Sequence, residues 1–201
     1  MSRWLFCALT GFMTVALLVL SCSPVRTPSA HRSATKPSLT DIRLAMDKRC
    51  PKSVPIAVVS GAKAVENKGP GISKELVPPG ANHLRVCRYV VAPPEQDHKP
   101  VPPPLASSMA TSSQGEIEHL QRLLDSFAPV EKNQSLSCPA ERRPDTALAA
   151  FSYPGGSRTV IVDIRLSGCL MASNGAGVYR PDNGDKLLAE MNSLVPLSRR
   201  R

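Results

Sequence analysis

The positions of the six cysteines constrain this chain of 201 residues more than any other feature of its sequence. Cys7 lies within an N-terminal apolar run, and Cys22 comes directly after that run. The other four are separated by 37, 51 and 31 residues, and they are Cys50, Cys87, Cys138 and Cys169. No pair has the C-x-x-C spacing of a zinc site, and no histidine lies near a cysteine at ligand spacing. The pattern therefore favours disulfide bonds, and we expect no metal or other cofactor.

The N-terminal segment has the form of an export signal. Arg3 supplies a positive charge, residues 4–20 are uncharged and apolar, and Ser21-Cys22 follows. The small residue ahead of a cysteine resembles a bacterial lipobox, which implies lipid transfer to the Cys22 thiol and cleavage after Ser21. Ordinary secretion and an uncleaved anchor helix are the alternatives, since the apolar run is at the short limit for a membrane span. All three place the remainder outside the cytoplasm, and the lipobox places it on the outer face of the plasma membrane.

An internal repeat selects one disulfide pairing among the three that four cysteines allow. Cys50-Pro51 and Cys138-Pro139 each open a segment with strand-like residues, a second cysteine and an amphipathic helix that ends at a proline. Residues 120–129 align without gaps with residues 187–196. If the two units are duplicates, each closes its own loop, which predicts the disulfides Cys50–Cys87 and Cys138–Cys169.

Composition and periodicity divide the chain into seven segments. We expect a signal peptide at 1–21, a disordered tether at 22–40 and a first disulfide unit at 41–92. A Pro-rich linker at 93–112 follows, with six prolines between Pro93 and Pro104, and then a helix at 113–129 that completes the first unit. A second disulfide unit at 130–197 and a basic tail at 198–201 end the chain.

Alternating apolar residues predict short antiparallel strands in both units. Residues 54–58 alternate as on an edge strand, and residues 83–91 form the next strand. Arg88 falls on the apolar face of that strand, so we expect a bulge or the strand end nearby. Residues 147–153 and 158–166 read as strands of the second unit, and Asn174-Gly175 predicts a hairpin between 169–171 and 178–179.

Two amphipathic helices complete the expected architecture. Ser113 and Glu116 predict a capping box for a helix that runs through Phe127, and Asp182 precedes a second helix stopped by Pro196. The predicted fold class is α+β, with two related small units. Each unit has short antiparallel strands and one amphipathic helix, and a disulfide closes it.

Three sequence strings together resemble a group of small exported actinobacterial proteins and lipoproteins of unknown function. They are LVPPGANHLRVCRYV at 76–90, SCPAERRP at 137–144 and FSYPGGSRTVIVDIRLSGC at 151–169. In that group a Pro-Gly-Ala turn leads to a Cys-Arg-Tyr strand, and a Cys-Pro segment leads to a strand that ends in Gly-Cys. The resemblance covers roughly residues 50–195. It implies the same cysteine pairing and an exported location, and it implies no activity.

The histidines offer little for catalysis. They lie in the tether, on a strand, in the linker and on the polar side of a helix, and they are His31, His83, His98 and His119. A nucleophilic pairing of His83 with Ser152 or Ser157 is conceivable, but neither serine has the sequence of a nucleophile elbow.

Acidic and glycine-rich candidates are equally weak. Asp163 with Asp145 or Glu141 could form a carboxylate pair, but Asp163 is expected on an outward strand face, where charges are usually solvated. Residues 174–177 (Asn-Gly-Ala-Gly) lack the strand–loop–helix setting and the Lys-Ser/Thr ending of a phosphate loop. Turn chemistry explains them better.

Basic residues give the chain a net charge of +9 and a pI of about 9.6. Some of these residues could form an anion-binding face, and the alternative is that they are scattered and only increase solubility. The residues of the candidate face are Arg85, Arg88, Tyr89, Arg142, Arg143, Arg158 and Arg165. Nucleic acid is a poor partner for an exported domain with three tyrosines. Much of the charge lies in the tether and the tail, where it can meet an anionic membrane or wall.

These features predict a lipid-anchored cell-envelope protein with a non-enzymatic binding or structural role. The membrane is the expected partner through lipid on Cys22, and an envelope polymer or protein is a further one. An envelope hydrolase with a site between the two units is one alternative function. A ligand sensor that acts on a membrane partner is another.

Overall fold

A computed structural model describes most of the chain from residue 42 onward. The described residues are 42, 45–55, 58, 67, 71–72, 74–91, 101–131, 134, 136–139, 144–156 and 158–197. The chain divides into two parts, residues 1–35 and 36–201, and every described residue belongs to the second part. The predicted signal peptide, tether and basic tail therefore lie outside the described residues, and so does Cys22.

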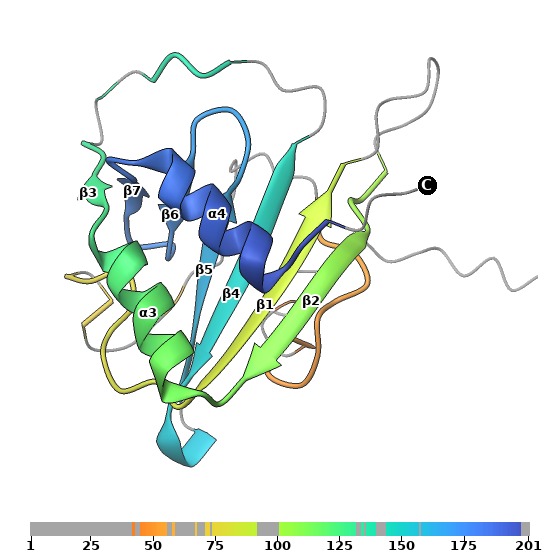
Figure 1. Ribbon diagram of the computed structural model, residues 1–201, viewed down its shortest axis with the longest axis vertical. Coiled ribbons are helices and arrows are strands. Elements are labelled where there is room, and N and C mark those ends of the chain that lie inside the picture. The colour runs from red at the N-terminus through yellow and green to blue at the C-terminus, as the bar shows by residue number, and fades with distance from the viewer. Residues whose placement is uncertain are drawn as a thin grey trace, which may run out of the picture. The chain divides into compact units, whose positions relative to one another are not determined.

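A seven-stranded antiparallel sheet forms the centre of the second part (Figure 1). Its strands are β1 (His83–Val90), β2 (Leu105–Thr111), β3 (Ala128–Pro129), β4 (Asp145–Ser152), β5 (Thr159–Arg165), β6 (Met171–Ser173) and β7 (Val178–Arg180). Their order across the sheet is β2-β1-β4-β5-β6-β7-β3. With two helices beside the sheet, this arrangement confirms the α+β class. The strands expected at 83–91, 147–153 and 158–166 and the hairpin at Asn174-Gly175 are all present.

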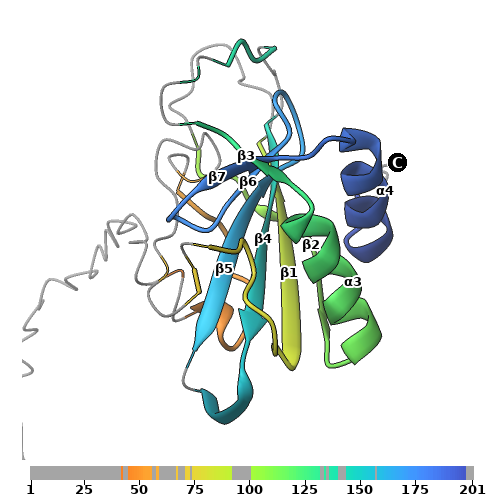
Figure 2. The same ribbon diagram turned by 90° about the vertical axis from the view of Figure 1, so that its left-hand side faces the viewer.

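Two helices cover one face of the sheet (Figure 2). They are α3 (Gln114–Asp125) and α4 (Gly184–Leu194), and their fully buried residues are Ile117, Leu120, Leu124, Leu187 and Met191. Leu120 and Leu124 of α3 and Met191 of α4 join one apolar cluster with side chains of β1, β4 and β5. The spacing of these residues by three or four positions explains why the predicted helices form here, since it places them on one side.

The helix ends differ in how they are capped. Ser113 lies at the N-cap of α3, but its side chain makes no capping hydrogen bond, so the expected capping box is absent. At α4 the cap is Asn183, whose side chain accepts hydrogen bonds from the backbone of Asp185 and Lys186. These bonds satisfy two of the backbone N–H groups that a helix start leaves free.

The opposite face of the sheet is covered by the chain that precedes β1. The apolar side chains that cover it are Ile42, Met46, Val54 and Val58, and each is at most 1% exposed. They contact Tyr89, Leu148 and Ile161, which are on the strand face turned away from the helices. The disulfide Cys50–Cys87 and a hydrogen bond of 3.0 Å from the Tyr89 hydroxyl to the Pro51 carbonyl hold this segment on the sheet. The central strands are therefore apolar on both faces, as strands buried on two sides must be.

Both predicted disulfides are present. Cys50 is bonded to Cys87 and Cys138 to Cys169. The expected division into two related units is not confirmed, because β1 pairs with β4 along its whole length, from His83 opposite Ser152 to Val90 opposite Asp145. The two expected units thus share one sheet and one helix-side core.

Three expected segment assignments differ from the structure. Residues 105–111, which were expected within the Pro-rich linker, form β2, because the prolines end at Pro104 and the following backbone pairs with β1. No strand is present over residues 54–58 in the described part; Val58 is helical, and Val54 and Val58 point inward together at a spacing of four. The helix expected to reach residue 129 ends at Asp125, and Ala128–Pro129 forms β3.

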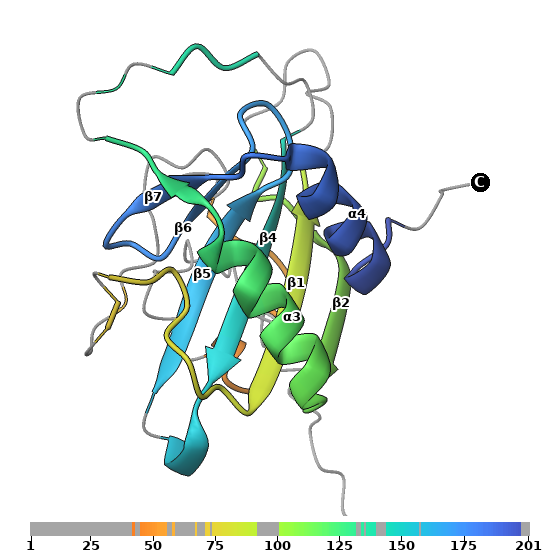
Figure 3. The same cartoon turned by 60° about the vertical axis from the view of Figure 1, so that its left-hand side comes forward.

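The short strand β3 brings the chain from α3 to the far edge of the sheet. After α3, β3 pairs with β7 at the edge opposite β2 (Figure 3). A bulge or the strand end was expected near Arg88, and the β1–β2 register indeed shifts between Arg88 and Tyr89.

Candidate binding surface

His83 and Ser152 lie opposite each other on β1 and β4, but they do not form a nucleophilic pair. The ring nitrogen Nδ1 of His83 lies 3.1 Å from the Ser112 hydroxyl. The Ser152 hydroxyl lies 3.4 Å from that of Thr159, which donates to Asp47 at 2.7 Å. No hydrogen bond joins His83 to Ser152 in the described part of the chain, and Ser157 lies outside it.

Asp163 and Asp145 lie on opposite faces of the sheet and form no carboxylate pair. Asp145 binds Arg88 on the helix side, whereas Asp163 accepts a hydrogen bond of 2.9 Å from the Thr146 hydroxyl on the other side. Asp163 is 4% exposed, so the expectation of a solvated, outward-facing charge is wrong. Burial raises its pKa to about 7, against the lowering effects of Thr146 and Arg165. Glu141, the third acidic candidate, is outside the described residues.

Arg88 is a structural residue of the core rather than part of an anion-binding face. Its guanidinium is bonded to Asp145 at 2.5 and 3.0 Å, to the Asn192 side chain at 2.8 Å and to the Val195 carbonyl at 3.0 Å. The residue is 3% exposed. These bonds tie β1 to β4 and to the end of α4, which explains how a charge is tolerated on the apolar face.

The remaining members of the expected basic face are dispersed. Arg85 donates to the Met46 carbonyl, and Tyr89 is buried under the segment that precedes β1. The guanidinium of Arg158 lies 4.9 Å from the centre of the Tyr153 ring, at the turn between β4 and β5. Arg142 and Arg143 lie outside the described residues. Arg88 and Tyr89 are buried, so the seven residues do not present a common anion-binding surface.

The Asn-Gly-Ala-Gly segment is a structural turn, as its sequence indicates. Gly175 has a φ of 81°, and the Asn174 carbonyl oxygen Oδ1 accepts hydrogen bonds from the backbone of Ala176 and Gly177. The Asn174 amide also donates to the backbone carbonyls of Ile72, Glu75 and Leu76. This buried side chain therefore fixes the loop before β1 to the β6–β7 hairpin, a role that its turn signal does not indicate.

Three adjoining depressions lie around β3, β7 and the segment after β3. Their volumes are about 550, 370 and 530 Å³, within the usual range for ligand sites. Gln134 lines all three. We refer to these depressions together as the β3–β7 surface.

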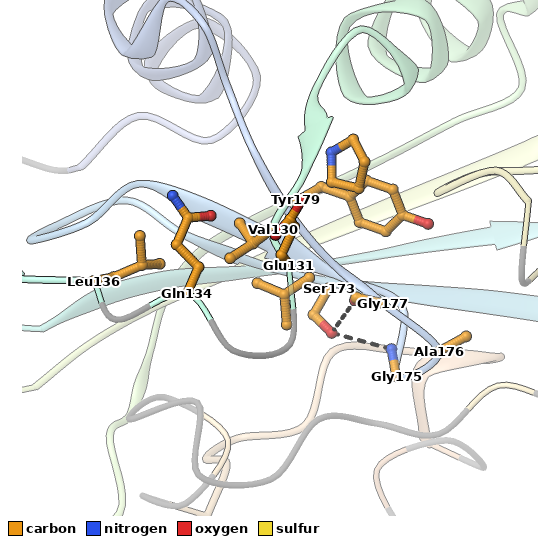
Figure 4. Close-up of a pocket in the computed structure, with 11 residues that line it drawn as sticks. Val130, Glu131, Gln134, Leu136, Ser173, Gly175, Ala176, Gly177 and Tyr179 are labelled. Carbon is orange, nitrogen blue, oxygen red and sulfur yellow. Dashed lines mark hydrogen bonds between the residues drawn. The ribbon is translucent and has the colours of Figure 1, made fainter.

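The largest depression has an apolar rim with a few polar groups. Figure 4 shows Gln134 and Leu136 from the segment after β3 on one side and the hairpin residues on the other. Val178 is 41% exposed at this place. The Ser173 hydroxyl donates to the Gly177 carbonyl and accepts from the Gly175 backbone, so it is already engaged within the hairpin.

The disulfide Cys138–Cys169 borders the third depression. Cys169 lines it together with residues 137 and 139, and Arg180 and Asp182 line it as well. The β3–β7 surface therefore combines apolar contacts, an amide and charges of both signs. Such a surface can hold a ligand by burial and hydrogen bonds. In the described part of the chain, no group of three or more His, Cys, Asp or Glu residues could hold a metal ion.

Sequence reasoning did not single out the β3–β7 surface. Its lining comes from residues 128–139 and from residues 168–184, which are remote in sequence. The Asn174-Gly175 signal gives the position of the hairpin, but no local pattern indicates that Gln134 lies beside it.

No protein-family model matches this chain, and no significant match is found among the curated proteins or the solved structures.

Proposed function

We propose that this chain is a lipid-anchored cell-envelope protein with a non-enzymatic binding or structural role. The observation that carries the proposal is the pair of disulfides, Cys50–Cys87 and Cys138–Cys169. Disulfides form and persist in oxidising compartments, so these two point to an extracytoplasmic location. No helix in the described part of the chain is long and apolar enough to cross a membrane.

The lipid anchor is supported by the sequence. The apolar run of residues 4–20 ends beside Cys22, and the composition of residues 22–40 predicts a tether. Two or three acyl chains give stable membrane attachment, whereas a single chain is released.

A binding role is supported by the contacts of the candidate acid–base residues, which are engaged in structural interactions. His119 lies 3.1 Å from Glu190 on the helix surface, Asp145 neutralises Arg88, and Asp163 is buried and hydrogen-bonded to Thr146. A hydrolase site between two units is disfavoured, because the β1–β4 contact is a continuous ladder with apolar side chains on both faces. The β3–β7 surface is the proposed place of contact with an envelope polymer or protein.

Metabolic labelling with a palmitate analogue tests the anchor. We expect label on the wild-type chain and on Cys7→Ala, which is the matched control because Cys7 lies in the segment that cleavage removes. We expect no label on Cys22→Ala. Label on Cys22→Ala would overturn the anchor and leave the binding role open.

Retention on isolated, detergent-washed cell-wall fragments tests the binding role. Val178→Asp places a charge on the rim of the largest depression, and we expect it to reduce retention severalfold. Val101→Asp is the control, since Val101 is also exposed and lies outside the three depressions. Equal retention of the two variants would exclude the β3–β7 surface as the wall contact.

A further inference from the structure

The two disulfides lie in different surroundings. Cys87 is fully buried on β1 and belongs to the apolar cluster under the segment that precedes β1, and Cys50 packs against that cluster. Cys138 is exposed and Cys169 is partly buried, and neither belongs to either of the two apolar clusters of the described residues. Cys50–Cys87 is therefore part of the core, whereas Cys138–Cys169 lies at its periphery.

The two disulfides also differ in the access that they offer to a thiol. Cys169 lines the third depression of the β3–β7 surface, which has a volume of about 530 Å³ and so has room for a side chain of another protein. Cys50 and Cys87 line none of the three depressions, and the Cys87 sulfur lies 3.3 Å from the sulfur of the buried Met46. Exchange requires a thiolate to reach a disulfide sulfur, so Cys138–Cys169 is the more accessible of the two bonds.

A covalent bond, rather than hydrogen bonds, joins residues 136–139 to the connection between β5 and β6. In the described part of the chain, the backbone of this stretch forms no hydrogen bond with a strand or a helix. The Cys169 sulfur lies 3.8 Å from the Ser137 carbonyl oxygen, but a disulfide sulfur has no proton to donate. Cleavage of the disulfide therefore removes the attachment of residues 136–139 to the β5–β6 connection.

We propose that Cys138–Cys169 is a site of thiol–disulfide exchange with a protein dithiol of the cell envelope, and that its reduction releases residues 136–139. Exposed disulfides are the labile and regulatory ones, whereas buried structural disulfides resist reduction. Leu136 lines the first and third depressions, so its release removes part of their wall (Figure 4). The exchange thus changes the shape of the β3–β7 surface, and the effect of this change on binding rests on the proposed function.

Two exchange steps complete the reduction. A thiolate of the partner attacks the Cys169 sulfur from the depression, forms a mixed disulfide and expels the Cys138 sulfur as a thiolate. Cys138 is exposed, so this thiolate takes a proton from water. The second thiol of the partner loses its proton and attacks the partner's own sulfur in the mixed disulfide. This step expels the Cys169 thiolate, which is protonated in turn.

The exchange is balanced and reversible. The partner gives up two electrons and two protons and becomes a disulfide, and this chain gains two thiols. An oxidised dithiol partner restores the Cys138–Cys169 bond by the same steps in reverse, which an oxidising compartment favours. The core does not depend on this bond, because the two apolar clusters and Cys50–Cys87 remain in place when it is broken.

Differential alkylation of the full chain in exporting cells tests the exchange. Acid quenching preserves the thiols, one reagent labels the free thiols, and a second reagent labels the remaining cysteines after full reduction. We expect some chains to carry the first label at Cys138 and Cys169, while Cys50 and Cys87 of the same sample carry only the second. Cys50–Cys87 is thus the matched internal control. First label to the same extent at both pairs, or none at Cys138 and Cys169, would overturn the proposal.

Reduction of the purified full chain by dithiothreitol, in mild detergent, measures the difference in access. We expect Cys138–Cys169 to be reduced at least tenfold faster than Cys50–Cys87, as followed by alkylation and peptide mass spectrometry. Comparable rates would contradict the proposal, since they would mean that burial of Cys87 gives no protection.

Hydroxyl-radical footprinting of Cys138→Ser/Cys169→Ser tests the release of residues 136–139 without a reductant. We expect labelling of the Leu136 side chain to increase severalfold over wild type, whereas Leu148, which is fully buried in the sheet, stays unlabelled in both. Unchanged labelling of Leu136 would refute the release, and labelling of Leu148 would show that the bond holds the core instead. None of these measurements uses wall binding, so a failure of the proposed function is detected separately, by the retention of Val178→Asp.

Discussion

Replacement of Asp163 by asparagine should stabilise the fold, and the gain should grow with pH. Asp163 is 4% exposed on the sheet face covered by the segment before β1. Its folded pKa is raised from 3.8 to about 7, chiefly because burial disfavours the charged carboxylate. The Thr146 hydroxyl, at 2.9 Å, can donate to an asparagine carbonyl as it does to the carboxylate, so the substitution keeps this contact.

The direction of the pH dependence of stability follows from how many protons the folded and unfolded states bind. Between the unfolded and folded pKa values the folded chain holds a proton that the unfolded chain has lost. Stability from this group is therefore present at low pH and is lost as pH rises towards the folded pKa. At about 1.4 kcal/mol per pH unit, the full difference is about 4 kcal/mol, of which about 3 kcal/mol falls between roughly pH 5 and pH 8.

Urea unfolding of wild type and Asp163→Asn at a series of pH values measures this effect. We expect the difference in unfolding free energy to increase by about 3 kcal/mol in favour of the variant from about pH 5 to pH 8. Asp182→Asn, at an exposed position, is the control and should run parallel to wild type. A constant offset between Asp163→Asn and wild type over this range would refute the reasoning, since it would mean that Asp163 titrates alike in both states.

Other substitutions test the contacts that join the layers. Arg88→Met leaves Asp145 and the Val195 carbonyl without their partner, so we expect a loss of about 3–5 kcal/mol of unfolding free energy in urea. Tyr89→Phe removes only the hydrogen bond to Pro51 and should cost about 1 kcal/mol, whereas a loss above that of Arg88→Met would contradict this assignment. Asn174→Ala frees three loop carbonyls, and hydrogen exchange should show faster opening of the loop before β1, with unchanged exchange contradicting the role.

Features that have a direct pattern in the sequence could be predicted from it. The pairing Cys50–Cys87 and Cys138–Cys169 followed from an internal repeat, and the structure contains both bonds. The β6–β7 hairpin followed from Asn174-Gly175, because few other residue pairs adopt such a turn. The irregularity next to Arg88 was also indicated, by one charged residue on the apolar face of its strand.

Features that depend on which elements cover each face of the sheet could not be predicted from the sequence. Alternation on β5 suggested that Asp163 faces water, but the segment before β1 lies over that face and buries it. The Pro-rich composition of the preceding residues led us to assign β2 to the linker. Its seven residues have no strong strand pattern, and they form a strand because they pair with β1.

The sequence by itself therefore determined the disulfide pairing, the strands and helices with clear periodicity, and the α+β class. The strands and helices follow from the periodicity of neighbouring residues, whereas the disulfide pairing followed from the internal repeat. Only the tertiary structure decided that both expected units share one sheet, that Arg88 and Asp163 are buried on opposite faces, and that residues 128–139 and 168–184 surround common depressions. Each of these depends on contacts between residues far apart in sequence, because burial and ion pairing are set by whatever packs against a side chain, and the order of strands decides what that is.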